Sequence, residues 1–404
     1  MQNLEPWLGE KWWVSPFNFI GDVRRNFRIP DEVIFHDVTL RDGEQTPCVV
    51  FTMNDKIEIA KALDEIGVQR IEGGMPIVSE EDLNAIKGMV KEGLKARIFG
   101  FSRLVKDDID AVIRSDAEGV ICEGPVGIPK LKQLGWKMEE VFERILTIVD
   151  YAKDHGLITI FFGVDSTRAD LNFLVSLLTR LDRETKVDGF ALADTYGCTT
   201  PEGFGYMVRT IVNNVRKPLE VHTHNDFGLA VITTIYGILN GARVAHVSVN
   251  GIGERCGNAA LEEVALALRL LYGIPVKIKF EKLYELSKLI EKLSGIKLAS
   301  NKPVVGEHAF TRESGISVAG WVKYHLGSEA YLPEFVGNTH KIMLGKKSGR
   351  HSIEWKLKQL NLEASDEEIS KILKYVKDSS IAKKSCINDE EFINIYRKVK
   401  GQIN

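Results

Sequence analysis

Side chains that can bind a metal ion or an anion are concentrated in one short stretch, FHDVTLRDGEQTPCVV, which runs from Phe35 to Val50. The stretch begins in an apolar run, Val33–Phe35, that is typical of a buried strand. It continues into a polar loop that contains acids, a guanidinium and an amide. A solvated loop with a surface ion pair is the commoner explanation of a charge cluster, so a second observation has to decide. The polar residues are Asp37, Thr39, Arg41, Asp42, Glu44 and Gln45.

The second observation is the segment Glu220–Asp226, EVHTHND, far along the chain. On a strand, alternate side chains lie on the same face, so Glu220, His222 and His224 point the same way. Two imidazoles at this spacing can ligate one metal ion, and an Asp from another loop completes a set that leaves positions open for a substrate. A pair of histidines at this spacing is about as often structural as it is metal-binding. The acid-rich loop after the first strand favours the metal site.

These segments resemble those of the metal-dependent TIM-barrel family that includes isopropylmalate, homocitrate, citramalate and Re-type citrate synthases, together with 3-hydroxy-3-methylglutaryl-CoA lyase. Three motifs carry the resemblance, and a fourth, LGKKSGRHS (344–352), is weaker. The third motif has the form typical of the condensing branch. The three motifs are DVTLRDGEQTP (37–47), EVHTHNDFGLA (220–230) and NGIGERCGNAALEE (250–263).

The resemblance implies a divalent metal held by Asp42, His222 and His224, with Asn258 either ligating it or forming a hydrogen bond beside it. Mn²⁺, Mg²⁺, Zn²⁺ and Fe²⁺ all suit such a mixed ligand set. The ion is expected to chelate the carboxylate and 2-oxo oxygens of a 2-oxo acid and to polarise the carbonyl. Asn258 can alternatively be a plain helix cap.

The resemblance also assigns Arg41 to the stabilisation of oxyanion charge. The alternative is a structural ion pair between Arg41 and Glu72 or Glu220, and Glu72 is itself a candidate at the substrate site. Gln45 can bind the same oxygens or cap its loop. A further candidate is Thr195 for the carboxylate of the 2-oxo acid, and a plain helix cap is its alternative. Glu254 can form a buried pair with Arg255 that lines the site. Glu220 is a neighbour of the metal histidines or part of an acid/base relay.

Two departures from the family pattern concern catalysis and the acceptor. The segment Glu313–Gly320, ESGISVAG, has Ser317 where condensing members have a catalytic His. Since serine is no base near neutral pH without activation, His308 is the predicted replacement, with His351 and Tyr331 as alternatives. After the fifth strand, the usual acidic pair is reduced to Asp165. The altered pocket favours an acceptor with a distal carboxylate, which Arg103 would bind.

Three functions are compatible with these residues. The first is a Claisen-type synthase that joins acetyl-CoA to a 2-oxo acid and releases CoA. The second is a hydroxyacyl-CoA lyase running the reverse cleavage. The third is a non-catalytic metal-binding relative that lost its base. The resemblance further implies a homodimer.

The order of elements that must position these residues predicts a (β/α)₈ TIM barrel with a C-terminal α+β accessory region. Strands are expected at 33–38, 68–72, 96–101, 118–122, 157–163, 187–193, 218–224 and 244–249, each followed by a helix. Helices are predicted to start at 225–226 and near 257–258, and to be capped at Thr52, Ser79 and Thr200. The predicted domains are an aromatic-rich arm (1–32) that packs on the barrel or on a partner, a catalytic barrel (33–273) and an accessory region (274–404).

Composition excludes several classes of protein. The chain of 404 residues is 44% hydrophobic and 27% charged, with a net charge of −3, so neither nucleic acid nor an anionic membrane is expected as a partner. Five scattered cysteines without a CxxC pair suit a reducing compartment. No apolar run has membrane-spanning length, and the expected location is the cytoplasm. No nucleotide-binding loop places the CoA site; basic residues of the fourth motif are candidates for its phosphates.

Overall fold

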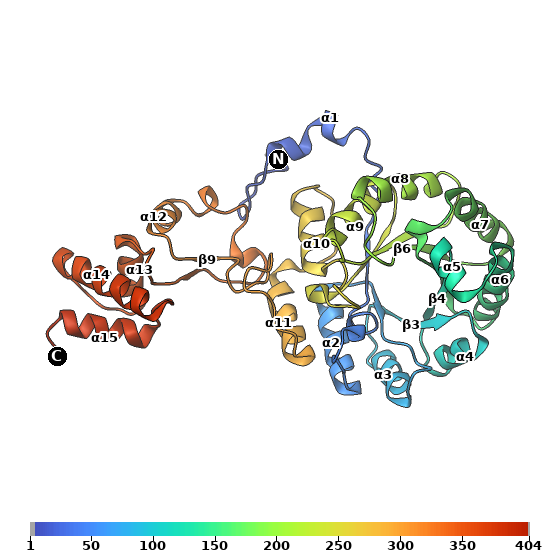
Figure 1. The fold of residues 1–404 in the computed structure, drawn as a ribbon, viewed down its shortest axis with the longest axis horizontal. Helices are drawn as coiled ribbons and strands as arrows, with labels where there is room; N and C mark the ends of the chain where they lie inside the picture. The colour runs from blue at the N-terminus through green and yellow to red at the C-terminus, as the bar shows by residue number, and fades with distance from the viewer. Residues whose placement is uncertain (1–4, 403–404) are drawn as a thin grey trace. The chain divides into compact units, whose positions relative to one another are not determined.

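The computed structural model describes residues 5–402. Contacts group the chain into two compact units, one formed by Pro16–Leu298 and the other by the segments on either side of it. The larger unit contains a closed barrel of eight parallel strands surrounded by helices (Figure 1). β1 and β8 close it, with Ile34 opposite Val244. The strands are β1 (Ile34–Asp37), β2 (Arg70–Glu72), β3 (Arg97–Arg103), β4 (Gly119–Pro125), β5 (Ile158–Val164), β6 (Gly189–Asp194), β7 (Leu219–Thr223) and β8 (Val244–Val247).

The predicted eight-stranded barrel is confirmed, and its helices begin where the capping residues predict. The side chains of Thr52, Ser79 and Thr200 each accept a hydrogen bond from a backbone N–H in the first turn of the helix that follows. Each outer helix buries one face against the strands. The helices are α2 (Met53–Ile66), α3 (Glu80–Lys91), α4 (Lys106–Arg114), α6 (Met138–Asp154), α7 (Leu171–Glu184), α8 (Pro201–Val212), α9 (Ala230–Leu239) and α10 (Leu261–Leu270).

The loops that carry the second and third motifs are longer than predicted. α9 begins at Ala230 and α10 at Leu261, so the predicted helix starts at 225–226 and 257–258 were wrong. The loop at Asn258 is instead tied to β7 by a bridge between His224 and Asn258. This bridge explains the difference, because it keeps the polar residues of both motifs in extended backbone at the strand ends. The short helix α5 (Ile128–Leu134), between Gly127 and Gly135, was not predicted.

The N-terminal segment divides between the units. Trp12 packs on Phe335 with 5.6 Å between ring centroids, and Leu332 N–H donates to the Lys11 carbonyl, both within the smaller unit. The segment from η1 (Pro16–Phe19) through α1 (Gly21–Arg24) belongs to the barrel unit, where the Arg24 side chain donates to the Tyr272 carbonyl at 2.9 Å. The second half of the arm therefore packs on the barrel, as predicted.

The described residues of the smaller unit form a two-stranded parallel sheet and four α-helices. β9 (Thr311–Arg312) pairs with β10 (Lys341–Ile342). An apolar cluster that includes Leu344, Ile353, Ile372 and Phe392 forms its core. The helices are α12 (Gly315–Lys323), α13 (Arg350–Gln359), α14 (Asp366–Lys383) and α15 (Asp389–Val399). α11 (Leu283–Ser294) is grouped with the barrel unit, and a domain boundary at 273 stays a prediction.

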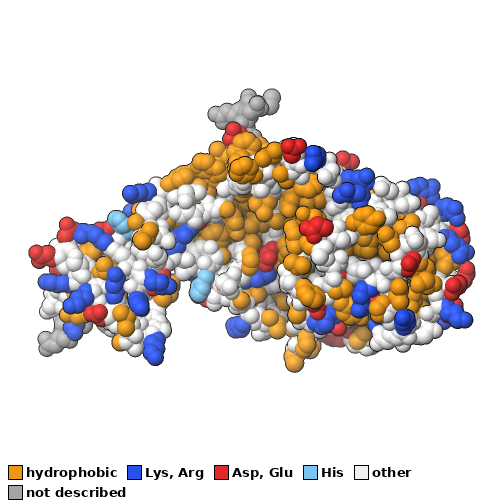
Figure 2. All heavy atoms as spheres, turned by 45° about the horizontal axis from the view of Figure 1, so that its top comes forward, with side chains coloured by type: hydrophobic (Ala, Val, Ile, Leu, Met, Phe, Trp, Pro, Cys, Tyr) orange, Lys and Arg blue, Asp and Glu red, His pale blue; other side chains and the backbone are white. Residues whose placement is uncertain are grey.

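The surface carries charges of both signs. Lys and Arg side chains are interspersed with Asp and Glu over the face shown in Figure 2, without a patch of a single sign. Within residues 5–402, no helix is both long enough and apolar enough to cross a membrane.

Candidate functional site

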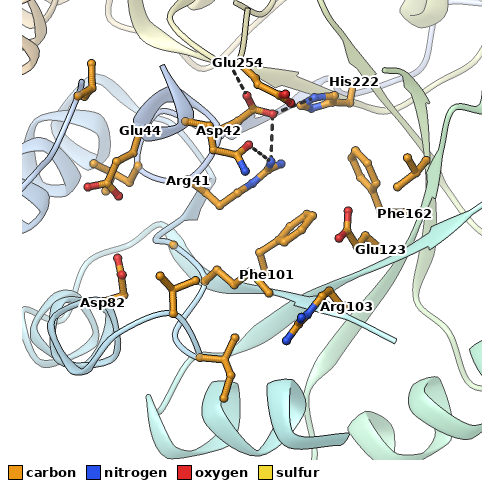
Figure 3. A pocket seen from close by; sticks show the side chains of 18 of the residues that line it. Arg41, Asp42, Glu44, Asp82, Phe101, Arg103, Glu123, Phe162, His222 and Glu254 are labelled. Atoms are coloured by element: carbon orange, nitrogen blue, oxygen red, sulfur yellow. Dashed lines mark hydrogen bonds and ion pairs between the residues drawn. The ribbon is translucent and has the colours of Figure 1, made fainter. Parts of the chain in front are cut away.

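A pocket of about 750 Å³ opens at the carboxyl ends of the barrel strands (Figure 3). This size is in the range of small-molecule sites, and in TIM barrels this end carries the active site. Polar and aromatic side chains from several different strands share its wall. The lining includes Arg41, Asp42, Glu44, Gln45, Met75, Asp82, Phe101, Arg103, Glu123, Phe162, Val164, Thr195, His222, His224 and Glu254.

The structure brings Asp42, His222 and His224 together. His222 Nε2 and His224 Nε2 are 3.2 Å apart, and they lie 3.4 and 3.6 Å from Asp42 Oδ2. All three side chains are buried. Donor atoms bonded to one ion at about 2.1 Å lie roughly 3.0 to 3.4 Å apart in octahedral or tetrahedral geometry. Two of the three separations lie in this range and the third is about 0.2 Å longer, so the three atoms can close on one divalent cation with a small movement of a side chain.

The ionisation states of this triad also suit a cation. Burial lowers the pKa of His222, and it lowers the pKa of His224 to about 4, so both imidazoles are neutral near pH 7. Burial opposes ionisation of Asp42, but Arg41 and the two imidazoles outweigh it and hold its pKa well below the usual range. A carboxylate and two neutral imidazoles can bind a metal without first losing a proton.

Asn258 lies beside the triad with a free acceptor. Its Nδ2 donates to the Ile252 carbonyl at 3.2 Å, and its Oδ1 is buried without a hydrogen-bond partner in the described chain. A buried amide oxygen without a partner is uncommon. It marks this side of the triad as a position for a further polar group, as the sequence indicates.

Arg41 is held on three sides and has one free donor. Its Nε forms an ion pair with Glu72, and its Nη1 donates to Asp42 Oδ2 at 3.0 Å and to Gln45 Oε1 at 3.3 Å. The guanidinium lies 4.1 Å from the Phe101 ring centroid. Its Nη2 is buried and has no partner within residues 5–402. Arg41 thus forms the structural pair with Glu72 that the sequence offered as an alternative, and one nitrogen of its guanidinium has no partner in the described residues.

A chain of buried polar side chains inside the barrel, the polar ladder, holds Arg41 in place through its ion pair with Glu72. Its members are Glu72, His36, His246, Glu220 and Arg70. Glu72 accepts from His36 Nε2 at 2.9 Å, and the His36 ring stacks on His246 with 4.4 Å between centroids. His246 Nε2 bonds to Glu220 at 2.8 Å, and Glu220 pairs with Arg70 at 2.6 Å. Burial opposes the charges on Glu72 and Glu220, but the neighbouring guanidiniums lower each pKa to about 2. Both carboxylates are therefore ionised.

This ladder differs from the sequence-based interpretation. Glu220 is buried in the ladder and is absent from the pocket lining, so a direct acid/base role has no support from its position. His36 and His246 were missed. His222 and His224 could be found because they lie two residues apart. His36 and His246 each stand alone in an apolar strand, so no such spacing marks them.

Three other predicted residues lie on the pocket wall. Thr195 Oγ1 accepts from the Asp165 backbone N–H at 2.8 Å. The backbone N–H of Glu254 donates to Asp42 Oδ1 at 3.1 Å. Its side chain pairs with Arg255 at 3.2 Å, but this pair is 53% and 30% exposed, and the predicted buried pair was wrong. Arg103 binds Asp108 through Nε and Nη2, both at 2.9 Å.

Glu123 is a pocket residue that the sequence did not reveal. It lies on β4 opposite Phe162 of β5. Burial raises the pKa of its carboxyl, although Arg41, Lys130 and Arg103 counteract this in part. A single acid inside an apolar strand gives no local signal of function, and only the closed barrel shows that it faces the pocket.

The predicted replacement bases lie in the smaller unit. His308 and Ser317 are exposed there, and exposed His351 pairs with Glu354 at 3.0 Å. The role of His308 stays a prediction.

Asp37, at the end of β1, is a buried carboxyl that makes the stability of the protein depend on pH. Its Oδ1 accepts from the Thr39 N–H at 2.9 Å, and its Oδ2 is buried without a partner in the described residues. Burial raises its pKa from 3.8 to about 7. Because the folded state then binds the proton more tightly than the unfolded state, stability decreases as the pH rises from about 4 to 7.

We therefore expect Asp37→Asn to lose less stability than the wild type between pH 5 and pH 8. The carboxyl accounts for roughly 3 kcal/mol of the loss over this interval, and an amide does not titrate. Thermal unfolding midpoints at both pH values measure the difference. An equal decrease in the two proteins would contradict the buried, protonated carboxyl.

Comparison with known families gives two matches. Residues 32–290 match the HMGL-like family, and residues 304–384 match the family described as homocitrate synthase post-HMGL domain-like. Together they cover the barrel and much of the smaller unit.

Individual proteins with known names are similar over nearly the whole chain. Homocitrate synthase AksA of Methanothermobacter thermautotrophicus is 40% identical over 98% of this chain and 100% of its own. (R)-Citramalate synthase CimA of Methanocaldococcus jannaschii is 44% identical over 91% of this chain and 74% of its own. A probable 2-isopropylmalate synthase of Methanopyrus kandleri is 42% identical over 87% and 70%. In structure, the HMG-CoA lyase of Bacillus subtilis shares the fold with a TM-score of 0.61 and 20% identity, over 68% of this chain and 97% of that one.

Proposed function

The chain belongs to the HMGL-like family, and from this premise we infer that it is a condensing enzyme. It joins acetyl-CoA to a 2-oxo acid, and a water molecule then hydrolyses the thioester of the product, which releases CoA. Relatives named for homocitrate, citramalate and isopropylmalate synthesis share about 40% of its residues. The observation that supports the proposal most strongly is the set of convergent donor atoms of Asp42, His222 and His224 beside the free Nη2 of Arg41.

We propose that Asp42, His222 and His224 hold a divalent metal, with the Asn258 Oδ1 beside it. When bound, Mn²⁺, Mg²⁺, Zn²⁺ or Fe²⁺ would supply Lewis acidity that polarises the 2-oxo group of the acceptor. The protein contributes three preorganised ligands at the bottom of a pocket. The Glu254 N–H holds the second oxygen of Asp42 in place at 3.1 Å.

Arg41 would stabilise the charge that forms during condensation. Attack by the acetyl-CoA enolate on the 2-oxo carbon places negative charge on the carbonyl oxygen, which becomes an alkoxide. The free Nη2 can donate to this oxygen, and Glu72 and Gln45 keep the guanidinium from rotating. A donor fixed before the reaction stabilises the transition state without reorganisation. Thr195, on the same wall, is the proposed contact for the acceptor carboxylate.

A base must remove a proton from the acetyl methyl group to form the enolate. We propose His308 for this role from the sequence. Ser317 occupies the position where condensing members of the family have a catalytic His, and a serine cannot act as a base without activation. A homodimer, which the resemblance implies, is likewise a prediction.

The direct test is release of the CoA thiol from acetyl-CoA by metal-loaded protein across a panel of 2-oxo acids. Pyruvate, oxaloacetate, 2-oxoisovalerate and 2-oxoglutarate cover the acceptors of interest. We expect release with at least one acid, and we expect His308→Ala to lose roughly 10²-fold in kcat or more. His351→Ala tests the alternative base. His155→Ala, at the exposed histidine that follows α6, is the matched control and should retain activity.

Each outcome of this test has a clear meaning. Release that needs both a metal and an acceptor supports the synthase. Metal-loaded protein that releases no CoA with any acid, but cleaves a hydroxyacyl-CoA, would be a lyase. Metal-loaded protein that catalyses neither reaction would be the non-catalytic metal-binding relative, and protein that binds no metal would exclude both enzymatic functions. Unchanged activity in His308→Ala would reject that residue alone.

A further inference from the structure

We propose that Glu123 determines the acceptor of this enzyme, by excluding 2-oxo acids that carry a second carboxylate and admitting those with an uncharged side chain. The proposal rests on the condensing function inferred above. It replaces the expectation that Arg103 would bind a distal carboxylate of the acceptor.

The position of Glu123 relates it to the acceptor side chain. Its carboxylate projects into the pocket from β4, near the rings of Phe101 and Phe162 (Figure 3). These rings are 6.0 Å apart and edge to face. Phe162 also packs on the metal-binding His222, with 5.2 Å between centroids. An acceptor held at the metal site would therefore extend its side chain along this aromatic wall toward Glu123.

The Glu123 carboxylate is not neutralised by a partner. It forms no hydrogen bond or ion pair within residues 5–402, and burial raises its pKa. Nearby charges are Arg41, Arg103, Lys130 and Glu72. The first three reduce its cost of ionisation, but none is in direct contact with it.

The two arginines of the pocket wall already form ion pairs with acidic side chains other than Glu123. Arg41 pairs with Glu72 and Asp42. Arg103 is locked onto Asp108 by two side-chain bonds of 2.9 Å. The remaining charged residues of the lining, besides the metal triad, are acids: Glu44, Asp82, Glu123 and Glu254.

This arrangement is unfavourable for a second carboxylate. A distal carboxylate would lose water and meet the unpaired carboxylate of Glu123. The Arg103 guanidinium that could offset the repulsion is bound to Asp108, and the one unpartnered nitrogen of Arg41 is assigned to the alkoxide. A methyl or ethyl group would instead contact Phe101, Phe162 and Met75, all in the lining. The geometry therefore favours a monocarboxylic 2-oxo acid with a short apolar side chain.

The test compares acceptors of equal length that differ only at the end of the chain. The pairs are 2-oxobutyrate against oxaloacetate and 2-oxovalerate against 2-oxoglutarate. CoA release gives kcat/KM for each acid with metal-loaded wild type and Glu123→Gln, which has nearly the same shape without the charge. We expect the wild type to favour the monocarboxylic acid of each pair by roughly tenfold or more, and the variant to lose most of that preference.

The matched control is Glu118→Gln, the same change at an exposed residue just before β4, which should leave the preference unchanged.

If Glu123→Gln is too unstable to assay, the binding of 2-oxovalerate and 2-oxoglutarate to the wild type decides the question. Calorimetry measures this binding with Mn²⁺-loaded protein and no acetyl-CoA. Tighter binding of the monocarboxylic acid supports the proposal. A preference of the wild type for the dicarboxylic acids, or a preference that survives in Glu123→Gln, would overturn it. Absence of CoA release with every acid would instead reject the condensing function.

Discussion

Replacing Asp42 by alanine is expected to remove the bound metal and to lower kcat/KM by roughly 10³-fold or more. Asp42 Oδ2 is the oxygen on which both histidine nitrogens converge, at 3.4 and 3.6 Å. Without it, two imidazoles remain as ligands, and Arg41 loses a partner 3.0 Å away. Metal content by elemental analysis, measured with CoA release on the same preparation, tests both consequences.

A matched control separates the metal site from general damage. Asp107→Ala removes an exposed carboxylate from the first turn of α4 and should leave metal content and activity close to wild type. An Asp42→Ala protein that retained a full complement of metal and normal activity would show that the triad is not the metal site.

The second large effect is expected for Arg41→Lys, which should lower kcat by about 10² to 10³-fold while the protein keeps its metal. A lysine ammonium cannot hold Glu72, Asp42 and Gln45 and also present a free N–H, because it lacks the planar fork of the guanidinium. Steady-state kinetics and metal analysis distinguish loss of transition-state stabilisation from loss of the ion.

The matched control for this variant is Arg97→Lys, at the exposed start of β3, where the same change should have little effect. If Arg41→Lys instead raised KM with kcat unchanged, Arg41 would act in ground-state binding of the acceptor and not on the developing alkoxide.

Much of the barrel could be predicted from the sequence because each strand is an apolar run and each helix has a periodic face. The predicted strand at 118–122 corresponds to Gly119–Pro125, and the helix predicted between the strands at 118–122 and 157–163 corresponds to Met138–Asp154. The helix starts after the second and third motifs were misplaced because no local signal announces a bridge such as that between His224 and Asn258. That bridge depends on two segments more than thirty residues apart.

The site residues also divide into those that a local sequence signal reveals and those that only the folded barrel reveals. Asp42, His222 and His224 could be recognised because local motifs carry them. Glu123, His36 and His246 could not, since each stands alone in an apolar strand and gains its neighbours only when the barrel closes. Whether the Arg103 guanidinium is free to bind a ligand depends on Asp108, five residues away, and the sequence alone did not show that the two form an ion pair.

The most direct test of the central claim is detection of the new carbon–carbon bond. Acetyl-CoA labelled with ¹³C at both acetyl carbons would be incubated with metal-loaded protein and the acceptor that supports CoA release. Carbon NMR should then show the labelled methyl carbon converted to a methylene that is bonded to the former 2-oxo carbon of the acceptor. Release of CoA together with free labelled acetate, and no such product, would show that the protein hydrolyses the thioester and does not condense it.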